Sequence, residues 1–154
     1  MRWKLTALVA LAAAAVTVVS LAVGAPVAGK QRVLIERSGT APFVLTPQTP
    51  GALKGDTGVA SFCCWTSRYI TREGEKIEVS NPRLTLAGKS GTLVVSNRME
   101  WADAPGGYAL FTGTWKVISG TGAYAGLTGG GRVAGVVLPN GQSKWRRVGT
   151  LSPK

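Results

Sequence analysis

The chain has 154 residues, with 18 Lys and Arg against 7 Asp and Glu, a formal net charge of +11 and no histidine. This length suits one domain with a short appendage rather than two full domains. Without histidine the chain cannot form a Ser-His-Asp or Cys-His nucleophile system, and two cysteines cannot supply a four-thiolate metal site. We therefore expect neither a metal site nor a cofactor.

Residues 1–29 have the features of a signal peptide with a helical apolar core. Arg2 and Lys4 supply a positive n-region, and residues 5–23 carry no charge. Cleavage after Gly29 is a fair alternative to cleavage after Ala25, which a proline follows. The apolar run is also long enough to span a bilayer as an uncleaved anchor. Both alternatives predict a domain outside the cytoplasm, either secreted or membrane-anchored.

Residues 30–56 are expected to form an extended lead-in segment that contains the first strand. Residues 31–37 alternate loosely between apolar and polar side chains, which predicts a strand. Residues 38–54 carry three prolines and two glycines, a composition typical of an extended loop.

Residues 57–154 are predicted to form a β-barrel. Runs typical of strands, each bounded by turn residues, cover residues 59–70, 76–79, 83–87, 92–101, 108–118, 132–138 and 144–151. No window has a sustained helical period with caps, so very little helix is expected. A meander of about eight strands hides its edges best by closing. The predicted fold class is therefore all-β, a closed antiparallel barrel of about eight strands preceded by the signal helix.

The stretch from Gly113 to Gly131, GTWKVISGTGAYAGLTGGG, contains a strand that leads into a G-T-G-x-Y-x-G run and then a glycine-spaced strand. It resembles the allene oxide cyclase barrel-like proteins, a group that includes the plant dirigent proteins. The match is close over this stretch and only architectural over the rest of the chain. The resemblance implies an eight-stranded barrel with an apolar cavity, in a family often seen as dimers or trimers. It transfers no active-site residue, because the glycines are scaffold features.

Aromatic side chains of the predicted strands are candidates to line a ligand cavity. Because small barrels fill their interiors with side chains, ordinary core is the favoured alternative. Tyr124 is also a candidate to plug one end of the barrel. The aromatic candidates include Phe62, and the predicted ligand-binding residues are Trp65, Tyr69, Trp101, Phe111, Trp115 and Tyr124.

The weak catalytic candidate is Glu100, which forms with Asp103 the acidic pair that flanks Trp101. A carboxylate against apolar surface can have a raised pKa and act as a general acid or base. We favour the alternative of a strand end that leads into an exposed turn. Strand alternation places Glu100 on the polar face.

The two cysteines, Cys63 and Cys64, are neighbours in the chain. On a regular strand they would point to opposite faces, which favours two free thiols over a strained vicinal disulfide.

The densest basic cluster is Lys144, Arg146 and Arg147 around Trp145. Basic groups beside an aromatic ring can bind single-stranded nucleic acid, but export argues against that partner. An anionic envelope surface is a better candidate, and a solvated basic face is the default.

The leading hypothesis is a secreted, non-catalytic binding or structural barrel whose apolar interior holds a small hydrophobic ligand. The alternative is a cyclase or isomerase-like enzyme in which Glu100 or a tyrosine assists a reaction inside the cavity. The sequence leaves open whether the interior is hollow or filled and whether the chain forms a homo-oligomer.

Overall fold

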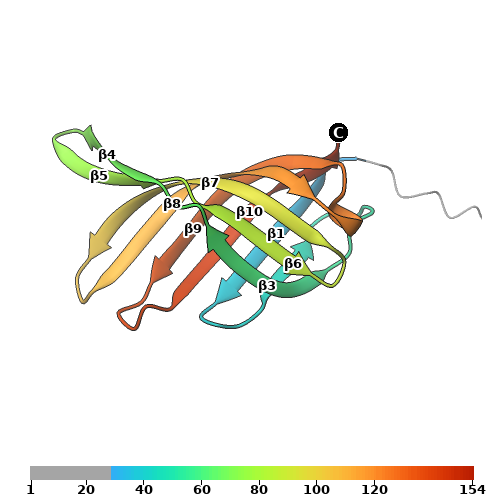
Figure 1. Ribbon diagram of the computed structural model, residues 1–154, viewed down its shortest axis with the longest axis horizontal. Coiled ribbons are helices and arrows are strands. Elements are labelled where there is room, and N and C mark those ends of the chain that lie inside the picture. The colour runs from blue at the N-terminus through green and yellow to red at the C-terminus, as the bar shows by residue number, and fades with distance from the viewer. Residues whose placement is uncertain (1–28) are drawn as a thin grey trace, which may run out of the picture.

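The computed structural model describes residues 29–154 (Figure 1). The expected signal peptide therefore lies almost wholly outside the described residues. One short 3-10 helix, η1 (Gly122–Tyr124), accompanies the strands of the described chain. The strands are β1 (Gln31–Ser38), β2 (Phe43–Pro47), β3 (Asp56–Cys63), β4 (Ser67–Arg72), β5 (Glu75–Ser80), β6 (Arg83–Gly88), β7 (Thr92–Ala104), β8 (Tyr108–Gly120), β9 (Leu127–Val137) and β10 (Ser143–Pro153).

Eight of these strands form a closed antiparallel barrel. Their order around the barrel is β7-β6-β3-β2-β1-β10-β9-β8, and β8 pairs again with β7 to close it. The closing ladder is long and runs from Leu93↔Gly120 to Ala104↔Tyr108, with an irregularity at Val94 and Val95. Closure satisfies the backbone groups that an open sheet would leave at its edges. The predicted all-β class and eight-stranded closed barrel are confirmed.

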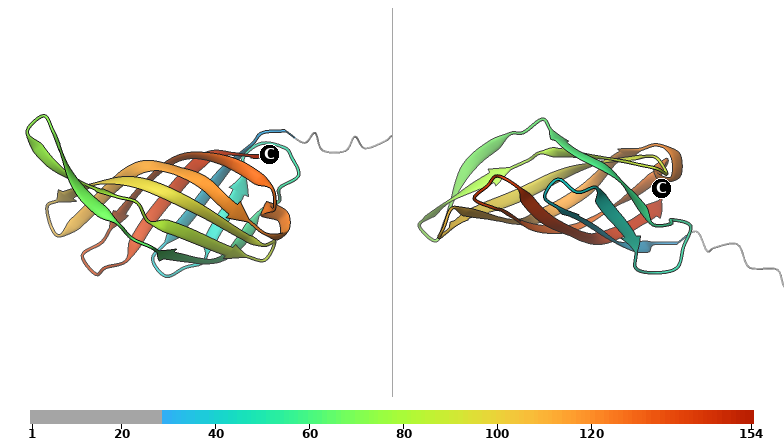
Figure 2. Two further views of the ribbon diagram at one scale, coloured as in Figure 1. Left: turned by 45° about the horizontal axis from the view of Figure 1, so that its top comes forward. Right: turned by 90° about the horizontal axis from the view of Figure 1, so that it is seen from below.

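The hairpin of β4 and β5 projects beyond one end of the barrel, opposite the end where the C terminus lies (Figures 1 and 2). It joins the sheet through three residue pairs between β5 and β7. The single strand predicted over residues 59–70 is wrong. Cys64 has a φ of 56°, a left-handed conformation that is uncommon for residues other than glycine, and it lies directly after the end of β3, in the break that separates β3 from β4.

The predicted loop over residues 38–54 contains a barrel strand, β2. Phe43 and Leu45 are buried while Val44 is half exposed, so β2 follows the ordinary strand alternation. Pro42 precedes the strand and Pro47 ends it, positions where a missing N–H costs the ladder least. The segment predicted to lead into the barrel thus contributes two of its strands, β1 and β2.

Side chains fill the interior of the barrel. Phe111 and Trp115 are its bulkiest central groups, and both are at least 95% buried. Glycines make room for them, since a Cβ at Gly135 would meet the Phe111 ring and one at Gly149 would meet the Trp115 ring. The packed interior includes Val33, Ile35, Phe43, Leu45, Leu84, Leu86, Leu93, Val95, Met99, Val133, Trp145 and Leu151.

A buried tyrosine closes the barrel end that lies away from the hairpin. The hydroxyl of Tyr124 on η1 donates a hydrogen bond of 2.8 Å to Oδ2 of Asp56 on β3. The same carboxylate accepts backbone N–H bonds from Thr57, Lys89 and Ser90 at 2.8, 3.0 and 3.2 Å. We call Tyr124 and Asp56 the plug. Tyr124 thus seals one end, as the sequence indicated.

Candidate functional site

Four aromatic side chains are in contact with one another at the end of the barrel that carries the hairpin. We call Phe62, Trp65, Trp101 and Phe111 the aromatic mouth. Trp101 and Phe111 are paired directly across β7 and β8, and both belong to the inward-facing row of their strand. The same row continues through Gly135 on β9 to Trp145 on β10. The mouth is therefore built on rigid barrel strands, with Trp65 added from the short segment after β3.

The rings of the aromatic mouth form a chain from solvent into the core. The ring centroids are 6.4 Å apart for Phe62 and Trp65, 5.7 Å for Trp65 and Trp101, and 4.8 Å for Trp101 and Phe111. These separations are those of favourable aromatic contacts. Trp65 is 48% exposed and Phe62 36%, whereas Phe111 is 4% exposed. A ligand that contacts the outer rings would thus extend a chain of edge-to-face and tilted aromatic contacts that ends in the core.

The backbone at Cys64 brings Trp65 to this position. Its positive φ ends β3 and turns the chain, and the next residue, Trp65, lies between Phe62 and Trp101. Trp101 is held in turn by the projecting hairpin, because its indole N–H donates a hydrogen bond of 2.7 Å to the hydroxyl of Ser80.

A buried arginine lies beneath the aromatic mouth. Arg147 on β10 has no exposed surface, and its guanidinium carbon is 4.1 Å from the Trp145 ring centroid and 5.8 Å from that of Phe62. Its Nε and Nη2 donate to Oδ1 of Asn97 at 3.4 and 3.2 Å, and Asn97 donates to the Pro82 carbonyl at 3.1 Å. Burial lowers the pKa of Arg147 to about 9, so the group stays protonated at neutral pH.

Two donors in this buried cluster lack a hydrogen-bond partner within the described chain. They are Nη1 of Arg147 and Nε1 of Trp145. Buried polar groups in proteins are nearly always paired, and a buried charge without a counter-charge is costly. The cluster under the mouth therefore has a recognition capacity that the barrel itself does not use.

The six predicted ligand-binding residues lie in four places. Trp65, Trp101 and Phe111 form the mouth together with Phe62. Tyr69 is 61% exposed on the hairpin, where the Lys76 ammonium lies 4.3 Å from its ring centroid. Trp115 is buried in the middle of the barrel, and its indole N–H donates to the Val148 carbonyl at 3.3 Å. Tyr124 lies at the plug, the opposite end.

A hollow of about 410 Å³ connects Tyr69 with the mouth. It lies between the hairpin and the end of β7, and Tyr69, Lys76, Glu78 and Trp101 contribute to its lining. Register explains the arrangement, because Tyr69 pairs with Glu78 and Glu78 pairs with Trp101, which places the three side chains in one row. Four of the six predicted residues thus lie at the mouth end.

Sequence reasoning missed Asn97 and the interior position of Arg147. Arg147 was grouped with Lys144 and Arg146 as a basic surface cluster, and the structure divides that cluster. Lys144 and Arg146 are outside, where Arg146 pairs with Glu36 at 2.7 Å, and Arg147 is inside. The signal that could have found it is alternation, which puts Arg147 on the same face as Trp145.

Glu100, the weak catalytic candidate, lies on the outer face of β7. Its carboxylate accepts two hydrogen bonds from Arg72, at 2.9 and 3.0 Å, and one from Arg98 at 3.0 Å. The bonds from Arg72 and then Arg98 lower the pKa of Glu100, although partial burial opposes them. The group is therefore an ion-paired carboxylate at neutral pH, and it faces away from the barrel interior.

The cysteine thiols are close together rather than on opposite faces. Both residues are exposed and free, and their Sγ atoms are 2.6 Å apart. The opposite-face prediction is wrong because Cys64 leaves the strand conformation on which it depended. A neighbouring thiol raises the pKa of Cys63, chiefly through their hydrogen bond.

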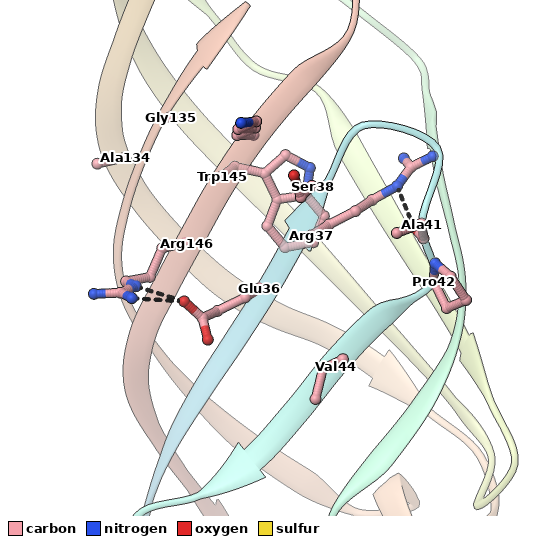
Figure 3. Close-up of a pocket in the computed structure, with 11 residues that line it drawn as sticks. Glu36, Arg37, Ser38, Ala41, Pro42, Val44, Ala134, Gly135, Trp145 and Arg146 are labelled. Atoms are coloured by element: carbon pink, nitrogen blue, oxygen red, sulfur yellow. Dashed lines mark hydrogen bonds and ion pairs between the residues drawn. The ribbon is translucent and has the colours of Figure 1, made fainter.

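A second hollow, of about 680 Å³, lies beside Trp145 near the turn between β1 and β2 (Figure 3). In Figure 3 the Glu36–Arg146 ion pair forms one side, and Arg37 on the other reaches the Ala41 carbonyl at 3.1 Å. The hollow is shallow and open to solvent. Trp145, which stacks on Arg147, contributes to its lining.

Fold and site together define the class: a small closed β-barrel, plugged at one end and aromatic at the other, with a buried cation beneath the aromatic end. Comparison with family models, curated proteins and solved structures finds no match to this chain. The similarity to the allene oxide cyclase barrel-like group stays a prediction from residues 113–131. Within residues 29–154, no helix has the length and apolar character needed to cross a membrane.

Proposed function

We propose that this protein is a secreted, non-catalytic binding barrel that holds a small apolar ligand at the aromatic mouth. The observation that carries the proposal is the chain of tilted ring contacts from Trp65 through Trp101 to Phe111, which is solvent-accessible at its outer end. Contiguous aromatic surface beside a hollow is typical of ligand sites in small proteins.

The packed interior decides where the ligand would lie. Trp115, Met99 and Leu93 fill the barrel between mouth and plug, so a ligand is not expected deep inside it. The hollow of about 410 Å³ between the hairpin and Trp101 has a charged lining that includes Glu75, Lys76, Glu78 and Asp103, which does not suit an apolar ligand. The ligand is therefore expected to cover Trp65 and Trp101 rather than to enter this hollow.

The wider setting of the proposal comes from the sequence. The positive n-region and apolar run of residues 1–29 support export, and residues 113–131 support a relationship to the allene oxide cyclase barrel-like group. Exposed basic side chains such as Lys144 favour association with an anionic envelope surface after export.

Binding of N-phenyl-1-naphthylamine, a neutral probe that fluoresces in apolar surroundings, tests the site. We expect saturable binding by the wild type and a loss of about tenfold in affinity for Trp65→Ala or Trp101→Ala, because each removes a stacking surface. Val59→Ala is the matched control, since Val59 is 69% exposed but on the outer face of β3. Equal effects of Val59→Ala and Trp65→Ala, or no saturable binding, would reject the proposal.

A further inference from the structure

The charge of Arg147 is not balanced by any carboxylate. Its hydrogen bonds go to Asn97, a neutral amide, and no ion pair reaches it within residues 29–154. Residues 1–28 contain no Asp or Glu, so the rest of the chain cannot supply one either. A buried guanidinium without a counter-charge lowers the free energy of unfolding, and an apolar side chain of similar size would fill the same space.

The free hydrogen-bonding capacity is concentrated at one place. Nη1 of Arg147 and Nε1 of Trp145 are both buried and have no hydrogen-bond partner in the described chain. The guanidinium carbon of Arg147 lies 4.1 Å from the centroid of the Trp145 ring. Both atoms are donors and neither can accept. The complementary group is therefore an acceptor that bears negative charge.

The cover of this cluster is the outer part of the aromatic mouth. Phe62 lies 5.8 Å from the guanidinium and is 36% exposed, and Trp65 leans on it from a segment outside the barrel ladder. A ligand would reach the guanidinium by displacing these two side chains, and such a side-chain movement leaves the pairing of β3 with β6 in place. An incoming molecule would then meet aromatic rings first and the cation behind them.

We propose that the ligand of the mouth is an amphipathic anion, an aromatic or apolar body carrying one carboxylate, and that its carboxylate binds Arg147 while its body stacks on Trp65 and Trp101. This inference rests on the proposed function and adds the chemical class of the ligand. The planar guanidinium fork matches a carboxylate geometrically, and charge-assisted hydrogen bonds are stronger than neutral ones. Asn97 positions the fork by holding Nε and Nη2, which leaves Nη1 for the ligand.

Calorimetric titration with 2-naphthoate and its neutral counterpart 2-naphthamide tests the charge preference. The wild type should bind 2-naphthoate about tenfold or more tightly than 2-naphthamide, because a buried charge-assisted bond is gained. Arg147→Met should remove that preference: it should weaken 2-naphthoate binding strongly and 2-naphthamide binding less, because the amide carbonyl can accept a hydrogen bond from Nη1 but carries no charge. Arg146→Met is the matched control: it removes the same charge from the outer face of the same strand, and it should keep the preference.

The outcomes separate the two proposals. Suppose that 2-naphthamide binds and that Trp65→Ala weakens this binding, but that Arg147→Met leaves 2-naphthoate binding intact. The proposed carboxylate contact with Arg147 is then wrong, and the proposed ligand site at the aromatic mouth is still supported. An equal loss for Arg146→Met and Arg147→Met would assign the effect to general surface charge and overturn the inference. Failure of both naphthalene probes, with N-phenyl-1-naphthylamine still bound, would overturn the anion and leave the aromatic mouth standing, whereas failure of all three probes would reject both proposals. If Arg147→Met does not fold, Arg147→Lys serves instead, since it keeps the charge but loses the fork and should reduce the preference for 2-naphthoate.

Discussion

The two ends of the barrel each place one charged group in the interior, and they treat it differently. At the plug, the Asp56 carboxylate accepts hydrogen bonds from Tyr124 and from three backbone N–H groups. At the mouth, Arg147 is fully buried with one neutral partner, Asn97, and an unpaired Nη1. Arg147 is also the more deeply buried of the two, since Asp56 is 7% exposed and Arg147 has no exposed surface. A buried charge that is fully hydrogen-bonded by its own chain stabilises the fold. A buried charge with unpaired donors can still bind a ligand.

The largest effect should come from removing the plug carboxylate. Asp56→Ala leaves the Tyr124 hydroxyl and the N–H groups of Lys89 and Ser90 without their acceptor. We expect a loss of about 3 kcal/mol or more in the free energy of unfolding, measured by urea denaturation. Tyr124→Phe removes one of these bonds and should cost about 1–2 kcal/mol. Equal costs for the two variants would mean that the carboxylate does not organise the plug.

The plug should also weaken in acid. Burial alone would raise the pKa of Asp56, but the bonds from Tyr124, Thr57, Ser90 and Lys89 together lower it below the ordinary value of 3.8. The stability that this carboxylate contributes is therefore complete above that value, and it is lost as the pH falls through the lower pKa of the folded state. Denaturation midpoints between pH 6 and about pH 2 should fall less steeply for Asp56→Asn than for the wild type. Parallel pH profiles would contradict the assignment.

The mouth should respond differently. Arg147→Met replaces a buried, uncompensated cation with an apolar side chain, but it also leaves Oδ1 of the buried Asn97 without its donor. These two effects oppose each other, so we expect the free energy of unfolding to change by no more than about 1 kcal/mol. The measurement is the same urea titration, with Asp56→Ala as the reference for a partnered charge. A loss as large as that of Asp56→Ala would show that Arg147 supports the fold, and the contrast between the two ends would disappear.

The difference between the two ends was only partly predictable from the sequence. Alternation predicts the polar face for Glu100, and the structure places it there. The same rule puts Arg147 beside Trp145, but its charge favoured a surface position, because isolated charges are rarely buried. Its interior location depends on closure of the barrel around it, which is a property of all eight strands and not of β10.

The break after β3 was hidden for a different reason. Residues 59–70 have strand-like composition throughout, and a left-handed cysteine leaves no compositional signal of the kind that glycine gives. Because the break at Cys64 both frees the hairpin and directs Trp65 over the mouth, missing it meant missing how the site is assembled. The individual aromatic residues could be predicted, but their convergence could not.

A third charged group sharpens the comparison, because Glu100 is paired as fully as Asp56 but lies at the surface. Its partners Arg72 and Arg98 are about half exposed, so water and salt screen the attraction. Glu100→Gln should therefore cause a small loss of stability that shrinks further at high salt. It should leave the binding of N-phenyl-1-naphthylamine unchanged, since the carboxylate faces away from the mouth. A marked fall in probe affinity for this variant, with unchanged stability, would show that Glu100 contributes to the binding site. It would then support the alternative of a cyclase or isomerase-like enzyme.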